Sequence, residues 1–261
     1  MAAISRKRTL AFPNFPIASN VECMKHLLLI LSLGLCVACS PNGNASSSEL
    51  IPTLEKLAAE ENAEAMYHLG MAYHTGSGVD RDYKKSLTYF QDSARLGDPL
   101  GAYKLRCYYD GQGNGAVERN LDEALKYKLI AAEAGYALAQ QDVAGIYANR
   151  GESDNAMIWL EKAVGQGWSG ALMTYASVHN GSPGIQSDPV KTAAYFRLFL
   201  DRAKGDKGQE DWLRTFEENL TTEQMSQARK IVSEYQAKPT PLTLKALAGQ
   251  TSAEQLVNVS N

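Results

Sequence analysis

The chain has 261 residues, enough for a substantial buried core in one or two domains. Hydrophobic residues make up 44% and charged residues 21%, both ordinary for a globular protein with a water-facing surface. The formal net charge of −3 gives no basis for a partner as anionic as nucleic acid, so no nucleic-acid binding is predicted.

Residues 1–38 are predicted to be a leader and signal peptide. The apolar run 27–38 is shorter than the roughly 20 residues that a membrane-spanning helix needs, but it has the length of a signal-peptide apolar region. A signal peptide rarely carries so long a segment ahead of this region. Since Met24 and Lys25 form a conventional start, translation is expected to begin at Met24.

Residues 37–40 read Val-Ala-Cys-Ser and resemble the lipobox of bacterial lipoproteins. The resemblance implies cleavage before Cys39 and a thioether-linked diacylglycerol on it, although Cys36 stands where leucine is usual. Cys36 is the poorer candidate acceptor, because bulky Leu35 precedes it. Acyl chains on Cys39 would hold the protein on a lipid bilayer. By analogy, Ser40 after the lipidated cysteine implies an outer-membrane lipoprotein that faces the periplasm, with residues 39–48 as a polar tether.

Residues 49–204 carry an internal repeat. Two aromatic and aliphatic series recur at intervals of 32 to 38 residues, and glycines close the units. The first series is Leu69 with Tyr73, Leu105 with Tyr109, Val143 with Tyr147, and Tyr175 with His179. The second series is Tyr89, Tyr127, Trp159 and Tyr195, and the closing glycines are Gly97, Gly135 and Gly167. Two series with matched intervals predict one helix pair per unit.

The predicted fold class is all-α, a solenoid of stacked helix pairs. A single pair cannot cover its own apolar face, so neighbouring pairs must stack. Gly76 and Gly78 are expected in the turn inside the first unit, and Gly97, Gly135 and Gly167 at helix C-caps, where a positive φ favours glycine. Residues 51–60 are expected to form the second helix of an incomplete leading unit.

At residues 65–79 and 84–97 the chain resembles the Sel1-like repeat family, which is related to the tetratricopeptide repeats. The matching features are Ala65, Leu69-Gly70, Tyr73, Gly76-x-Gly78-Val79 and a helix that ends in Gly97. The second unit departs from the pattern at Arg106, where the family has glycine. The resemblance covers residues 62–203, is strongest in the first unit, and implies an adaptor that binds other proteins.

Two further segments follow the array. Thr221 to Gln224 form a capping box that opens a helix, and with Trp212 and Phe216 the region 205–237 is predicted to cap the last unit. Residues 238–261 contain few core-forming residues, so a flexible tail is expected.

No catalytic, metal or cofactor site is predicted. The loop at Asp110–Gly115 lacks the calcium ligands that such a loop needs at its third and twelfth positions, Gln112 and Leu121. Gly167 to Ala171 resemble a nucleophile elbow but follow a helix and not a strand. Cysteine-rich relatives of the family are associated with β-lactams. They carry a disulfide in each repeat, whereas this array holds only Cys107.

The predicted function is a membrane-anchored periplasmic scaffold that binds envelope or regulatory proteins through its repeat surface. In paired-helix solenoids the first helices line the concave side, where partners bind. Tyr67, Met71, Tyr103 and Cys107 lie off the main packing stripe and are the candidate contact residues. The alternatives are a fixed structural subunit of an export or assembly complex and, as the weakest, a β-lactam-binding or β-lactam-hydrolysing repeat protein.

Overall fold

The computed structural model describes residues 49–260, and in this part of the chain it contains thirteen α-helices and no strand. The predicted all-α fold of stacked helix pairs is confirmed. The lipidation candidate Cys39, the leader and the polar tether lie outside the described residues. The described residues divide into two units, one made of residues 49–143 together with 240–260 and the other of residues 144–239.

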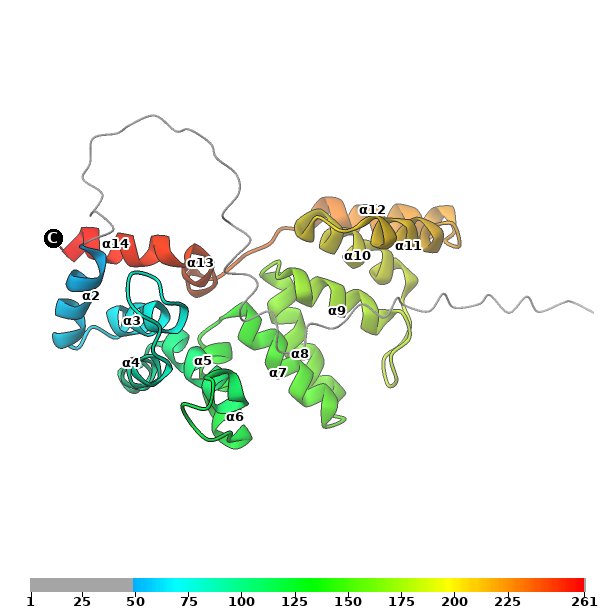
Figure 1. Ribbon diagram of the computed structural model, residues 1–261. Coiled ribbons are helices and arrows are strands. Elements are labelled where there is room, and N and C mark those ends of the chain that lie inside the picture. Colours follow the sequence, from blue (N-terminus) through cyan, green and yellow to red (C-terminus); the bar gives the residue numbers. More distant parts are fainter. Residues whose placement is uncertain (1–48, 261) are drawn as a thin grey trace, which may run out of the picture. The chain divides into compact units, whose positions relative to one another are not determined.

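The first unit begins with a single helix followed by helix pairs (Figure 1). Its helices are α2 (Leu50–Ala59), α3 (Ala63–Thr75), α4 (Tyr83–Arg95), α5 (Pro99–Cys107) with the π-helical turn η1 (Tyr108–Gln112), α6 (Leu121–Glu133) and the start of α7 (Ala137–Asn149). Helix α2 occupies the place expected for the second helix of an incomplete leading unit. Helices α3 with α4 and α5 with α6 form the two complete pairs.

Short polar residues fix where these helices begin. The side chains of Asn62, Asp82, Asp98 and Asn120 each accept a hydrogen bond from a backbone N–H in the first turn of the helix that follows. Such caps satisfy donors that the helix itself leaves unpaired. At the other end, Gly97 has a φ of 91°, as the predicted C-cap position requires.

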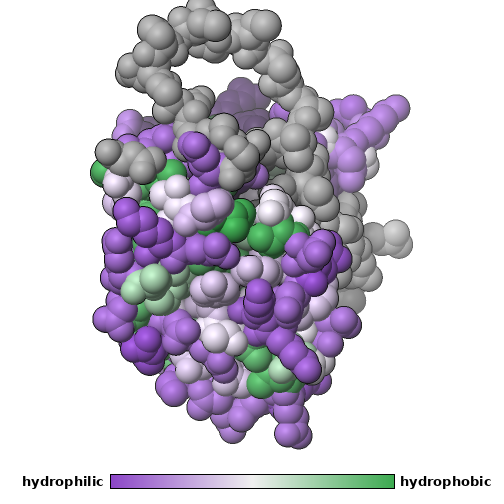
Figure 2. All heavy atoms as spheres, turned by 60° about the vertical axis from the view of Figure 1, so that its left-hand side comes forward, coloured by the Kyte–Doolittle hydropathy of each residue, from purple (hydrophilic) through white to green (hydrophobic). Residues whose placement is uncertain are grey.

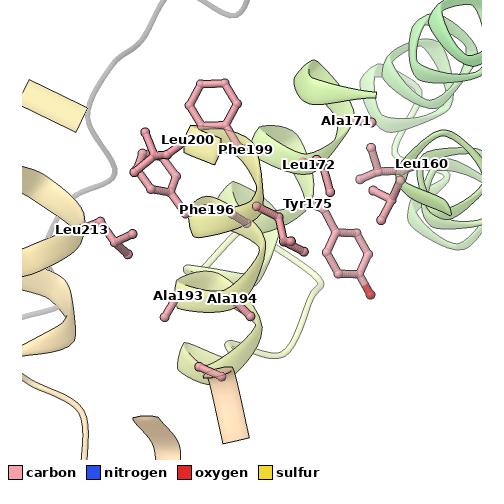
Figure 3. Close-up of a cluster of buried hydrophobic side chains, with 14 of the residues drawn as sticks. Leu160, Ala171, Leu172, Tyr175, Ala193, Ala194, Phe196, Phe199, Leu200 and Leu213 are labelled. Atoms are coloured by element: carbon pink, nitrogen blue, oxygen red, sulfur yellow. The ribbon is translucent and has the colours of Figure 1, made fainter. Parts of the chain in front are cut away.

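The second unit contains the rest of α7, then α8 (Ser153–Gly165), α9 (Ser169–His179), α10 (Pro189–Ala203), α11 (Lys207–Glu217) and α12 (Thr222–Glu234). Figure 3 shows part of its core, a buried cluster to which α9 contributes Leu172 and Tyr175 and α10 contributes Phe196 and Phe199. Helices α11 and α12 pack on α10 and contribute buried Leu213, Phe216 and Ala228. The predicted capping box at Thr221 is present at the start of α12.

The segment expected to be a flexible tail contains two helices, α13 (Pro241–Ala248) and α14 (Gln250–Ser260), so the expectation of an unstructured chain is wrong for these residues. Both helices belong to the first unit, and α14 packs on α2 and α3. Figure 1 shows them alongside the earliest helices. Few large apolar residues were available, but small Ala253 and fully buried Val257 are enough to fill the space beside α2.

Candidate protein-binding surface

The two predicted series of repeat residues meet inside three of the helix pairs. The rings of Tyr73 and Tyr89 stack with centroids 5.7 Å apart, and those of Tyr109 and Tyr127 stack with centroids 5.9 Å apart. In the second unit Tyr175 meets Tyr195 at 4.5 Å in an edge-on arrangement. These contacts hold the first helix of a pair against its second helix, as the recurrence of both series predicted.

A small residue next to the first series lets the second helix approach closely. A Cβ on Gly70 would lie 2.6 Å from Phe90 Cδ1, closer than Cβ contacts in proteins, so any larger residue would require the Phe90 ring or the helix to move. Phe90 is fully buried in the cluster that also holds Tyr67, Leu87 and Tyr108. The first repeat therefore packs a large ring against a bare backbone.

The second repeat replaces this pair with two cations. By the repeat register, Arg106 and Lys128 stand where the first repeat has Gly70 and Phe90. Arg106 is only 4% exposed, and its guanidinium lies 2.6 Å from Asp110 and 2.8 Å from Asp142. Lys128 Nζ lies 3.6 Å from the same Asp142 oxygen. Two carboxylates thus compensate the charge that the departure from the family glycine introduces.

A chain of polar side chains joins the first two repeats. His74 Nδ1 lies 3.0 Å from Tyr108 Oη, Tyr108 donates to Ser86 Oγ at 2.7 Å, and Ser86 donates to the Gly70 carbonyl at 2.8 Å. Burial lowers the pKa of His74 to about 4 and raises the pKa of Tyr108 to about 12. Both side chains are therefore neutral at pH 7, which suits a hydrogen-bonded chain away from water.

The structure places most of the predicted contact residues inside the protein. Tyr67, Tyr103 and Cys107 are 7%, 2% and 3% exposed, so their first role is packing. Tyr103 Oη accepts a hydrogen bond from Arg106 and lies 3.2 Å from Asp142. Met71 is partly exposed. Tyr67 and Met71 share the wall of one cavity, whereas Tyr103 and Cys107 do not line it.

The cavity lies between α2, α3 and the turn that joins α13 to α14. It has a volume of about 100 Å³ and is mainly apolar, and Gly249, Gln250 and Ala253 line the side opposite Tyr67 and Met71. The C-terminal helices are thus neighbours of Tyr67 and Met71, two of the four predicted contact residues.

Glu64 at the start of α3 is the polar centre of this contact. Its carboxylate lies 2.8 Å from Lys245 Nζ of α13 and 3.7 Å from His68 Nε2. His68 and then Lys245 lower the pKa of Glu64 to about 2, although partial burial of the carboxyl acts in the other direction. The carboxylate is therefore charged at neutral pH. Sequence reasoning missed this residue, since nothing in the repeat pattern marks its partner.

The signal that could have found the C-terminal helices is their capping sequence. Thr240 stands before Pro241, and Thr240 Oγ1 accepts from the backbone N–H of Thr243. A threonine cap followed by proline is a typical helix start.

Within residues 49–260, no group of three or more His, Cys, Asp and Glu side chains is placed to hold a metal ion. None of the described helices combines the length and apolar character that crossing a membrane requires.

The similarity to a known protein family lies in the first two helix pairs. Residues 63–98 and 100–136 match the Sel1 repeat family. Over 96 residues, which are 36% of its length, the chain is 35% identical to the ERAD-associated E3 ubiquitin-protein ligase component HRD3 of Candida glabrata. The chain spans about a tenth of that relative, 11% of its length.

Two solved structures align with this chain. A Sel1 repeat protein from Oxalobacter formigenes aligns with a TM-score of 0.56 at 23% identity, over 65% of this chain and 49% of that one. A protective antigen of uropathogenic Escherichia coli with an SLR fold aligns with a TM-score of 0.39 at 21% identity, over 76% of this chain and 59% of that one. Residues 63–98 and 100–136 therefore match the Sel1 repeat in sequence, and the fold of the array is similar to that of a solved Sel1 repeat protein.

Proposed function

We propose that this protein is a membrane-anchored scaffold that binds another protein through the face formed by the first helices of its repeats. Sel1 repeat proteins are helical-repeat scaffolds for protein interactions and bind protein partners. The observation that carries the proposal is that the first helices α3 and α7, together with α2, already accommodate a polypeptide segment, namely the chain's own helices α13 and α14.

The proposed location rests on the lipobox-like residues 37–40. Cys39 would carry the acyl chains, and residues 40–48 would separate the repeats from the bilayer. Ser40 favours the outer membrane, with the repeats in the periplasm. A scaffold held there would meet envelope proteins, which makes an envelope or regulatory protein the expected partner.

The family resemblance and the absence of a recognisable catalytic motif in the sequence favour binding over catalysis. The relative HRD3 is named as a component of an E3 ubiquitin-protein ligase. A role as one component among others fits the scaffold proposed here. It also fits the alternative of a fixed subunit, from which a scaffold with a transient partner differs in how long the complex lasts.

The test is site-specific photo-cross-linking of the full lipoprotein in its own envelope, followed by mass spectrometry. The photoreactive residue replaces partly exposed Met71 on α3, and exposed Thr88 on α4 is the matched control on a second helix. We expect one reproducible envelope protein cross-linked at Met71 and not at Thr88. Cross-linking to the same protein with equal yield at both positions, or to none under several growth conditions, would contradict the proposed face. Co-purification in detergent without cross-linking would indicate a fixed subunit.

A further inference from the structure

The last twenty or so described residues return to the first repeats. The C-terminal segment, residues 240–260, lies against residues that are more than 100 positions earlier in the chain. Thr240 Oγ1 donates to the Gly135 carbonyl at 2.9 Å, and Thr243 Oγ1 accepts from Ala137 N at 3.0 Å. Lys245 Nζ donates to Glu64 at 2.8 Å. The segment is thus held by specific polar contacts as well as by packing.

These contacts fall at the starts of two first helices, α3 and α7, and on Gly135, which lies in the connection between α6 and α7. Glu64 lies in the first turn of α3, and Ala137 is the first residue of α7. Between them, the charge of Lys245 also acts on Asp98, the N-cap of α5. We call the surface made by Glu64, Tyr67, His68, Gly135 and Ala137 the first-helix face. It is the face on which a solenoid of helix pairs receives its partners.

Apolar contacts complete the docking. Ala253 and Val257 of α14 are buried with Leu54, Leu57 and Leu69. Leu242 and Ala246 of α13 pack on the cluster around Tyr67 and Leu100. The segment therefore presents apolar residues at helical spacing, with one cation set to meet Glu64.

The docked segment covers apolar side chains of α2 and α3 in the first unit. Figure 2 shows that hydrophilic residues cover most of the described surface there, with apolar residues in small separate spots. On α13 itself, Leu244 and Leu247 stay 53% and 48% exposed. Helices of 8 and 11 residues are marginal on their own, so these two depend on the face for their stability.

A short extended stretch connects α12 to the C-terminal segment. Residues 235–240 are extended, and Tyr235 and Lys238 hydrogen-bond to the carbonyls of Val164 and Gly165 in the second unit. A segment released from the first-helix face would remain covalently attached to the rest of the chain. A short flexible connection gives the attached segment an effective concentration in roughly the millimolar range at the face, so the segment can compete there with a weakly binding partner.

From these contacts we propose that the C-terminal segment is an intramolecular occupant of the partner-binding face. The partner is an amphipathic helix of another protein that displaces the segment, with apolar residues at helical spacing and a lysine or arginine that takes the place of Lys245 beside Glu64. That another protein binds this face rests on the proposed scaffold function. Docking of the C-terminal segment on the face can be tested without that protein.

The probe is a fluorescein-labelled synthetic peptide of residues 239–261, added to the full chain and followed by fluorescence anisotropy. In the wild type the attached segment competes with the peptide. Lys245→Glu places a second anion beside Glu64 and weakens the attached segment, while Glu64 stays available to the wild-type peptide. We expect the variant to bind the peptide at least about tenfold more tightly than the wild type does.

A charge swap is the matched control. Glu64→Lys combined with Lys245→Glu restores an attached ion pair and repels the lysine of the peptide, so binding should return to the wild-type level. A second variant, Lys245→Glu with Ala253→Asp and Val257→Asp, releases the segment if the single change does not, and hydrogen exchange at residues 241–260 reports the release.

The proposal is overturned if backbone amides 241–260 lose their protection from hydrogen exchange in the single or the triple variant while the peptide binds that variant no more tightly than the wild type. It is equally overturned if even the triple variant leaves residues 241–260 as protected as in the wild type. Peptide binding together with no cross-linked envelope protein would uphold this inference and count against the scaffold function, so the two failures are distinguishable.

Discussion

Asp142 on α7 accepts a 2.8 Å hydrogen bond from Arg106 on α5, and this contact ties the start of one repeat to the core of the repeat before it. Arg106 is buried in a position where the family pattern has glycine. Asp142 also lies 3.6 Å from Lys128 Nζ, so one carboxylate serves two cations. The second repeat thus exchanges a small-and-large packing pair for an ionic network.

Asp142→Asn should therefore destabilise the protein. The variant leaves the shape unchanged but removes the charge that faces Arg106 and Lys128. Hydrogen bonds to charged groups are worth about 1.5–3 kcal/mol, and we expect a loss of about 2 kcal/mol in the free energy of unfolding. Urea denaturation gives the value. Exposed Glu133→Gln on α6 is the control, expected within about 0.5 kcal/mol of the wild type. Equal stability of both variants would show that the network contributes nothing.

Gly70→Ala tests the close approach of α3 and α4. The added Cβ would meet Phe90 at 2.6 Å, so the ring or the helix must move, at a cost of about 1–3 kcal/mol. Adding Phe90→Leu should recover part of the loss, because the smaller side chain makes room. Gly145→Ala is the control, since a Cβ there meets nothing within 4 Å. It should gain about 0.5–1 kcal/mol, as expected for a helical glycine. Equal melting temperatures for the Gly70 and Gly145 variants would contradict the packing.

Gly97→Val separates backbone strain from packing. Gly97 has a φ of 91°, and a Cβ there meets nothing within 4 Å, so the substitution is opposed by the backbone alone. A β-branched residue resists positive φ, and the expected loss is about 1–2 kcal/mol. Gly97→Asn should cost less, because asparagine tolerates this conformation. A melting temperature equal to the wild type for the valine variant would remove the C-cap assignment.

His74 gives the first unit a defined pH dependence. Burial lowers the pKa of His74 to about 4, below its ordinary value of 6.5, so the unfolded chain binds this proton more readily than the folded one does. The contribution of His74 to the free energy of unfolding is therefore constant above about pH 6.5 and falls as the pH drops toward 4. His74→Asn keeps a donor toward Tyr108 but cannot titrate. We expect the wild type to lose more stability than the variant between pH 6.5 and 4. Parallel curves would exclude His74 as the cause.

Cys39→Ala tests the anchor. If Cys39 carries the acyl chains, the variant should appear in the soluble fraction after membranes are pelleted, while the wild type stays in the pellet. Cys107→Ala is the control, since its thiol is buried in the array and should not affect partition. Continued pelleting of the Cys39 variant in high salt would rule out the lipoprotein proposal.

The repeat residues were sufficient to predict the fold, because recurring pairs such as Tyr73 and Tyr89 record which helix packs on which. The sequence also marked Arg106 as a departure. It did not identify the compensating charge, because Asp142 belongs to the next repeat and a lone aspartate on a helix is ordinarily solvated. The predicted contact residues Tyr67 and Tyr103 proved to be buried, since helical spacing alone does not distinguish a stripe that faces a partner from one that faces the next repeat.

The C-terminal helices were missed for a different physical reason. Composition predicts whether a segment can bury enough apolar surface by itself, and residues 240–260 cannot. Their order comes from a surface already built by α2 and α3, where an alanine and a valine suffice. Such a contact is visible only once both sides are placed.

The discontinuity of the first unit also has a consequence for synthesis. Its repeats are translated long before the helices that cover Glu64 and Leu54, with the whole second unit in between. At about 5–20 residues per second, the roughly 100 intervening residues leave the first-helix face uncovered for about 5–20 s on each new chain. During that interval the nascent repeats are open to other polypeptides, and synthesis of the last helices closes them.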